Sequence, residues 1–166
     1  MDSEQLKAVQ APLKAQYKST PGAALITLKA EGRLGEGVTC SIDTARALVD
    51  AGLHPATGGD GMHVCSGDML LQALVACAGV TLNAVATALA IPVGEARVTA
   101  EGDLDFRGTL GVDREAPVGF SAIRLNFEVD GISEEQKATL LKLTERYCVV
   151  YQTLRNSPQI AVTLGT

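Results

Sequence analysis

One apolar stretch constrains the fold of this chain more than any other segment. It runs from Ser66 to Ala90, reads SGDMLLQALVACAGVTLNAVATALA, and contains a single charged residue, Asp68. Most of its residues are good helix formers, Ser66 is suited to cap the helix, and Pro92 ends it. The sequence therefore predicts one long helix, apolar almost all round, with Cys77 near its middle.

Such a helix belongs either in a membrane or at the centre of a globular domain. The segment is long enough to span a bilayer. However, no Lys, Arg, Trp or Tyr flanks it, and no second apolar segment accompanies it. We therefore expect a buried central helix and no membrane partner.

The composition limits the partners and the compartment of the protein. At 166 residues the chain fits one domain and is long enough to bury a core. A net charge of −5, the absence of a basic run and an aromatic content of 4% argue against nucleic acid as a partner. The polar start MDSEQLKAVQ does not resemble a signal peptide, so we expect a cytoplasmic protein with reduced cysteines.

The rest of the chain alternates between helix and strand patterns. We expect helices over 3–18, 44–52 and 133–148, and strands over 23–29, 38–42, 97–107, 120–130 and 160–164. The run GRLGEG (32–37) is expected to form a hairpin loop, and 54–65 a second loop. Ser133 begins a capping-box pattern that ends at Gln136.

Two predicted antiparallel pairs on either side of one apolar helix indicate an α+β fold. The strands at 97–107 and 120–130 alternate apolar and polar residues, and the loop between them lets them pair. We find no repeat and no domain boundary. The sequence thus predicts a single domain over residues 1–166, with 1–20 as an N-terminal helical extension.

Cys77 and Cys148 are the first candidates for chemistry. They are 148 − 77 = 71 residues apart, too far for a local CxxC redox turn. Free cysteines are often simple core residues, and a buried thiol becomes reactive only where a neighbour stabilises its thiolate. Arg33, in the glycine-rich run, is the best local candidate for that neighbour, and a solvated loop arginine is the alternative.

A metal site is a second interpretation of the cysteines and histidines. His63 and Cys65 are two residues apart, and His54, Cys40 or Asp60 could complete a ligand set. Their convergence would favour a structural, metal-bound dimer. The spacing matches no standard zinc pattern, so we predict neither a metal nor another cofactor.

Three segments resemble the OsmC/Ohr family, the osmotically induced and organic-hydroperoxide-resistance proteins. GDMLLQALVACAG (67–79) is similar to that family's central helix with its reactive cysteine, here Cys77. AEGRLGEG (30–37) resembles its early hairpin with an arginine, here Arg33. ERYCVVYQTLRNSPQIAV (145–162) resembles its second cysteine segment, here Cys148. The order of these elements matches over most of residues 23–164.

The resemblance implies an α+β fold in which two copies intertwine around their long helices, with reactive sites at the homodimer interface. It implies thiol-dependent reduction of organic hydroperoxides, in which Cys77 becomes a sulfenic acid and Cys148 condenses with it to a disulfide. A dithiol reductant would reset the pair. Arg33 would hold Cys77 as a thiolate and polarise the peroxide. Apolar surroundings would favour fatty or aryl hydroperoxides over hydrogen peroxide.

Two positions depart from the family pattern. The family's peroxidases carry a glutamate that pairs with the arginine, and the equivalent position here, 77 − 10 = 67, is Gly67. Asp68 is adjacent but lies about half a turn away from the Cys77 face of the helix. Asp60 and His63 in the preceding loop are candidate substitutes.

The second departure is Val149, where many relatives have proline after the second cysteine.

Our leading hypothesis is a cytoplasmic two-cysteine peroxidase that acts in defence against oxidative stress. The alternative, favoured by Gly67, is an OsmC-like protein with little peroxidase activity that binds a small apolar ligand at the dimer interface.

Overall fold

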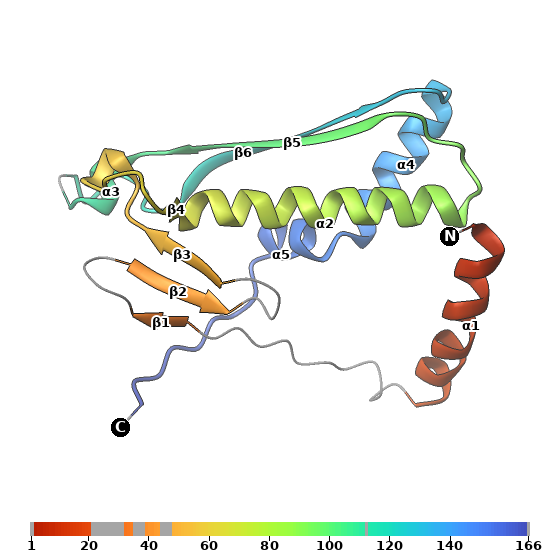
Figure 1. Ribbon diagram of the computed structural model, residues 1–166, viewed down its shortest axis with the longest axis horizontal. Coiled ribbons are helices and arrows are strands. Elements are labelled where there is room, and N and C mark those ends of the chain that lie inside the picture. The colour runs from red at the N-terminus through yellow and green to blue at the C-terminus, as the bar shows by residue number, and fades with distance from the viewer. Residues whose placement is uncertain (1, 21–31, 35–38, 44–47, 112, 166) are drawn as a thin grey trace.

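The computed structural model describes residues 2–20, 32–34, 39–43, 48–111 and 113–165. Its helices are α1 (Ser3–Ser19), α2 (Ser66–Ala88), α3 (Phe106–Thr109), α4 (Glu134–Tyr147) and α5 (Val149–Arg155), with a 3-10 turn at Pro55–Thr57. Its strands are β1 (Gly32–Leu34), β2 (Thr39–Asp43), β3 (Leu48–Gly52), β4 (Val64–Cys65), β5 (Ala96–Leu104) and β6 (Phe120–Val129). The long β5–β6 ribbon runs along one side of α2, and α5 and the smaller sheet lie on the other (Figure 1).

Helix α2 confirms the predicted long central helix, but only one of its faces is buried. Residues at helical spacing form that face, namely Leu74, Ala78, Leu82 and Ala86. By length and composition α2 could cross a membrane, yet it packs against β5, α4 and α5, and part of its apolar stretch is buried. The long central helix is present as expected, and in a single chain the elements packed on it, which include α1 and β4, bury one of its faces.

The start of α2 differs from the prediction by one residue. Cys65 is the N-cap, its side chain makes no capping hydrogen bond, and Ser66 is already the first residue of the helix. Strand β4 ends at Cys65, so the pairing of β4 with β3 determines where the helix can begin.

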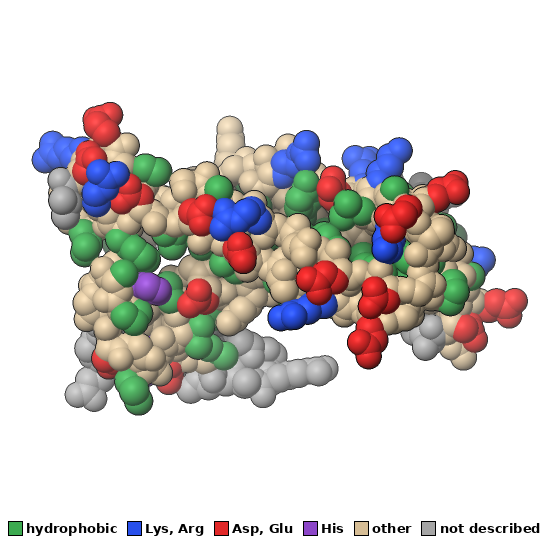
Figure 2. All heavy atoms as spheres, turned by 90° about the horizontal axis from the view of Figure 1, so that it is seen from above, with side chains coloured by type: hydrophobic (Ala, Val, Ile, Leu, Met, Phe, Trp, Pro, Cys, Tyr) green, Lys and Arg blue, Asp and Glu red, His purple; other side chains and the backbone are tan. Residues whose placement is uncertain are grey.

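Strands β5 and β6 pair antiparallel, as their alternating patterns predicted. The register runs from Ala96 opposite Val129 to Leu104 opposite Phe120, with an irregularity between Asp103 and Leu104. On the outer face Arg124 binds Glu101 and Asp103, with its Nη2 donating to Oδ1 of Asp103 at 2.8 Å. Figure 2 shows acidic and basic side chains interspersed along this face, with hydrophobic side chains between them and at the end that carries α3.

The smaller sheet corrects two predictions. Its order is β1-β2-β3-β4, antiparallel except for the parallel pair β3–β4. β2 confirms the strand expected at 38–42, but Gly32–Leu34 is a strand rather than a loop and Leu48–Gly52 a strand rather than a helix. Each pairs with an edge of β2, so tertiary pairing overrides local preference there. The predicted segments at 23–29 and 44–47 lie outside the described residues.

The second half of the chain follows its local signals until its last residues. Ser133 and Gln136 form the predicted capping box of α4, and Leu140 packs with Leu82 and Ala86 in the core. β5 stops at Leu104, earlier than expected, and α3 follows it. Residues 160–164 form no strand, and their apolar side chains are exposed.

Candidate functional site

The structure brings Cys77 and Cys148 together. Cys77 lies in the middle of α2, and Cys148 is the single residue that separates α4 from α5. The backbone of Cys148 is extended (φ −71°, ψ 111°), so the chain turns there and its side chain meets α2. The two thiols are near enough that each shifts the pKa of the other. Cys148 is 1% exposed and Cys77 is partly buried.

The surroundings of Cys77 favour its ionised form. Burial raises the pKa of the Cys77 thiol, but hydrogen bonds from the Val150 N–H, the Cys148 thiol, the Val149 N–H and the Thr81 hydroxyl outweigh burial. The net effect is a lowered pKa. All four of these donors are uncharged, so the thiolate is stabilised here by dipoles.

The surroundings of Cys148 act in the opposite direction. Burial raises the pKa of the Cys148 thiol, and the hydrogen bond and charge of Cys77 raise it further. The N–H groups of Tyr151 and Val150 offset part of this increase. The pair therefore holds its first negative charge on Cys77 and keeps the proton on Cys148, which is the division that a nucleophile and its thiol partner require.

Arg33, the predicted cation, lies in edge strand β1 opposite Ser41 of β2. Its side chain lies outside the described part of the chain. The same holds for the side chain of Cys40, whose backbone pairs with Leu34 and Ala51.

Gly67 lies in the first turn of α2, three turns before Cys77. A Cβ placed on it would make ordinary contacts with Phe120, Cys65 and Leu104, so an apolar corner surrounds this position. Asp68 is exposed. Asp60 accepts a hydrogen bond from the Met62 N–H at 2.9 Å within its own loop.

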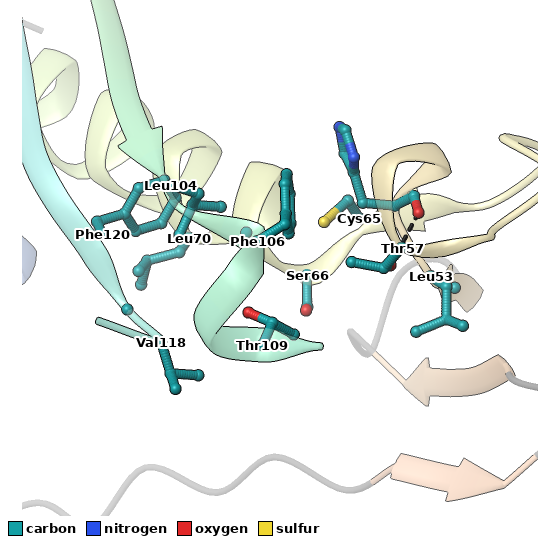
Figure 3. A pocket seen from close by; sticks show the side chains of 14 residues that line it. Leu53, Thr57, Cys65, Ser66, Leu70, Leu104, Phe106, Thr109, Val118 and Phe120 are labelled. Atoms are coloured by element: carbon teal, nitrogen blue, oxygen red, sulfur yellow. Dashed lines mark hydrogen bonds between the residues drawn. The ribbon is translucent and has the colours of Figure 1, made fainter. Parts of the chain in front are cut away.

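An apolar cavity of about 420 Å³ opens at this end of α2. In Figure 3, Leu70, Leu104 and Phe120 lie on one side of it, and Leu53 and Thr57 on the other. The His54 ring stacks on Phe106 with centroids 5.0 Å apart, and its Nδ1 accepts from the Ala56 N–H at 3.0 Å. The cavity can hold an apolar group, and the thiol of Cys65 lies on its wall.

The metal interpretation finds no geometric support in the described residues, where no three His, Cys, Asp or Glu side chains converge. His54, His63, Cys65 and Asp60 do not come together as a group of three ligands, and the side chain of Cys40, the other candidate ligand, lies outside the described residues.

Sequence reasoning missed the neutral donors around Cys77. Thr81 follows Cys77 by one helical turn, a spacing that places it on the same face of α2 and that could have identified it. The N–H groups of Val149 and Val150 carry no sequence signal, because only the fold brings them to α2.

The chain resembles known proteins in sequence and in fold. Residues 58–163 match the sequence model of the family described as OsmC-like protein. No curated protein matches the chain significantly in sequence. Among solved structures, an OsmC-like protein from Mycoplasma pneumoniae is 19% identical, with a TM-score of 0.66 over 80% of this chain and 89% of that chain.

Two further structures carry names that refer to hydroperoxides. An organic hydroperoxide resistance protein OsmC from Legionella pneumophila is 18% identical (TM-score 0.64; 80% of this chain and 92% of that chain). The organic hydroperoxide resistance protein OhrB of Bacillus subtilis is 20% identical (TM-score 0.58; 81% and 94%). At this identity the structures establish a shared fold. With the family match, which covers more than half of the chain, they show that this protein belongs to the OsmC-like family.

Proposed function

We propose that the protein reduces organic hydroperoxides with Cys77 and Cys148. The observation that carries this proposal is the pair of neighbouring thiols whose pKa values shift in opposite directions, down for Cys77 and up for Cys148. A low-pKa thiolate beside a protonated thiol is the arrangement that oxidation and disulfide closure need. Hydroperoxide resistance in the names of two fold relatives supports the same choice.

The reaction proceeds in three balanced steps. The Cys77 thiolate attacks the terminal oxygen of the hydroperoxide and the O–O bond breaks. The terminal OH stays on the sulfur, and the departing alkoxide takes a proton from water and leaves as the alcohol. Cys77 is thereby oxidised to a sulfenic acid. The Cys148 sulfur then attacks the Cys77 sulfur, a disulfide forms and water leaves. A dithiol reductant finally reduces the disulfide and is itself oxidised to a disulfide.

The proposal also includes a role for Arg33, a homodimeric active form and a cytoplasmic location. The Arg33 guanidinium supports the thiolate and polarises the peroxide. The active form is a homodimer, because α2 exposes much of its apolar surface in one chain. The protein works in the cytoplasm, where reductants keep its cysteines reduced.

The test is a titration of the reduced protein with tert-butyl hydroperoxide, followed by mass spectrometry of the cysteine peptides. We expect the loss of two thiols per chain, a Cys77–Cys148 disulfide, and recovery of both thiols with dithiothreitol. The Cys148→Ser variant should instead accumulate a Cys77 sulfenic acid that dimedone traps.

Cys65→Ser is the matched control, since Cys65 is a partly buried thiol outside the pair. This variant should form the disulfide at the wild-type rate. A Cys77 that stays reduced, or that reacts only as fast as a free thiol in solution, would exclude the peroxidase activity.

The second candidate function is the binding of a small apolar ligand, and the cavity at the start of α2 favours it. Ligand binding to the folded state raises thermal stability by mass action. A thermal-shift series with apolar ligands of increasing size should raise Tm in the wild type and have less effect in Leu70→Asp, which places a charge on the cavity wall. Equal shifts in both proteins would exclude this cavity as the site.

A further inference from the structure

Thr81 lies on α2 one turn after Cys77, on the same face of the helix. Its hydroxyl donates a hydrogen bond to the Cys77 carbonyl oxygen at 2.8 Å and is partly buried. The same hydroxyl also contributes to the lowered pKa of the Cys77 thiol, as a hydrogen-bond donor to its ionised form. One side chain thus has two acceptors within reach, and both belong to Cys77.

A threonine hydroxyl carries one proton and rotates to suit its best acceptor. A neutral thiol is a weak acceptor, so the proton points to the carbonyl while Cys77 is protonated. A thiolate is charged, and charge-assisted hydrogen bonds are about twice as strong as neutral ones. The carbonyl loses little when the proton turns away, because an intrahelical N–H bond still satisfies it.

We propose that Thr81 is a positioning residue for Cys77, whose hydroxyl turns from the Cys77 carbonyl to the Cys77 sulfur when the thiol ionises. The hydroxyl thereby stabilises the thiolate without a fixed charge, in a chain that has glycine at the start of α2. This inference rests on the proposed function for its role in catalysis, but the thiolate itself can be measured without peroxide.

Thr81 differs from the other donors in where it is attached. The Cys148 thiol and the N–H groups of Val149 and Val150 all belong to the segment that joins α4 to α5. Thr81 shares a rigid helix with Cys77. Its contact with the sulfur therefore persists if the α4–α5 junction shifts during disulfide formation.

The experiment measures the rate at which iodoacetamide alkylates Cys77, by peptide mass spectrometry, from about pH 5 to about pH 10. It uses the full-length wild type, Thr81→Val, which removes the hydroxyl with little change in volume, and Thr81→Ser, which keeps the hydroxyl. Thr87→Val is the matched control. Thr87 is a partly buried threonine of the same helix, about 15 Å further along its axis than Cys77.

We expect Thr81→Val to move the midpoint of alkylation to higher pH and to slow alkylation at neutral pH by about three- to tenfold. Its rate should converge with that of the wild type where both thiols are ionised. Thr81→Ser and Thr87→Val should retain the wild-type midpoint.

Two outcomes would overturn the inference: a Thr81→Val midpoint equal to that of the wild type, or an equal shift in Thr81→Ser, which would point to packing rather than the hydroxyl. A parallel reaction with tert-butyl hydroperoxide separates the two proposals. If wild-type Cys77 does not react with the peroxide while Thr81→Val shifts the midpoint as expected, the positioning role stands and the peroxidase function fails.

Discussion

Cys77 and Cys148 have the same side chain, but their surroundings shift the pKa values of the two thiols in opposite directions. Four neutral donors lower the pKa of the Cys77 thiol against the effect of burial, while burial and the neighbouring Cys77 raise the pKa of Cys148. Since an acid with a lowered pKa ionises first, Cys77 carries the thiolate at a pH where an ordinary cysteine, with a pKa of about 8.5, is still protonated.

This difference between the two pKa values predicts how the alkylation of Cys77 by iodoacetamide depends on pH. The midpoint for Cys77 alkylation should lie below that of free glutathione measured under the same conditions. A lowered pKa also means that the ionised thiol stabilises the fold above its unfolded pKa, and that this contribution disappears as the pH falls through the folded pKa. A midpoint at or above that of glutathione would contradict the assignment of Cys77 as the nucleophile.

Two adjacent leucines of α4, one buried and one exposed, allow a test of which contacts form the core. Leu140 is 1% exposed and packs against Leu82 and Ala86, whereas Leu141 is 40% exposed. Leu140→Ala should lower the free energy of unfolding by about 2 to 5 kcal/mol, because it leaves a cavity between α2 and α4. Leu141→Ala should cost less than about 1 kcal/mol. Urea denaturation compares them, and equal losses would mean that the α2–α4 contact is not the core.

At the scale of the elements, the junction between α4 and α5 connects backbone structure to thiol chemistry. Val149 is the first residue of α5, and its N–H reaches Cys77. Proline is tolerated at the first position of a helix, and the extended backbone of Cys148 is compatible with a following proline. Val149→Pro can therefore remove one N–H donor while the fold is kept.

We expect Val149→Pro to raise the alkylation midpoint of Cys77 with little change in the denaturation midpoint. Val149→Ala is the control, since it keeps the N–H and trims a side chain that is 69% exposed. If Cys77 in the Val149→Pro variant is alkylated with the same pH midpoint as in the wild type, the N–H of Val149 does not act on the Cys77 thiol.

The capping box of α4 gives a test of stability that is independent of the cysteines. The Ser133 Oγ accepts from the Gln136 N–H, and the Gln136 side chain accepts from the Ser133 N–H. Ser133→Ala should lower the free energy of unfolding by about 1 kcal/mol, measured by urea denaturation. Ser157→Ala, after the end of α5, should change it by less than about 0.5 kcal/mol. Similar losses in both would argue against the cap.

At the scale of the whole molecule, one chain leaves much apolar surface uncovered. Val80 on α2 is 73% exposed, and Ile160, Val162 and Leu164 are exposed along the extended C-terminal segment. Monomeric proteins rarely expose large contiguous apolar patches. A second copy packed against the open face of α2 would bury it.

Analytical ultracentrifugation should therefore find a particle of 2 × 17.3 = 34.6 kDa. Val80→Lys places a charge on the open face of α2 and should shift the protein toward the monomer or weaken its association by at least tenfold. Ala138→Lys, on an exposed position of α4, should leave the dimer intact. A monomeric wild type would exclude the proposed interface.

The sequence by itself determined the elements whose signals are local. The long apolar run predicted α2, alternation predicted β5, β6 and their pairing, and the spacing of Ser133 and Gln136 predicted the start of α4. These signals suffice because helical caps and the periodicity of apolar residues depend on neighbours a few residues away. The two cysteines and the family resemblance were also readable before any fold was known.

Only the tertiary structure decided which distant segments of the chain pair or come into contact. Leu48–Gly52 looks helical alone and becomes strand β3 because β2 offers it unpaired backbone groups. The separation of 71 positions between Cys77 and Cys148 does not predict that the two thiols act on each other's pKa, nor that the N–H groups of Val149 and Val150 act on Cys77. The pKa of a thiol depends on burial and on donors that the fold assembles from distant segments, so the lowered pKa of Cys77 is a property of packing rather than of sequence.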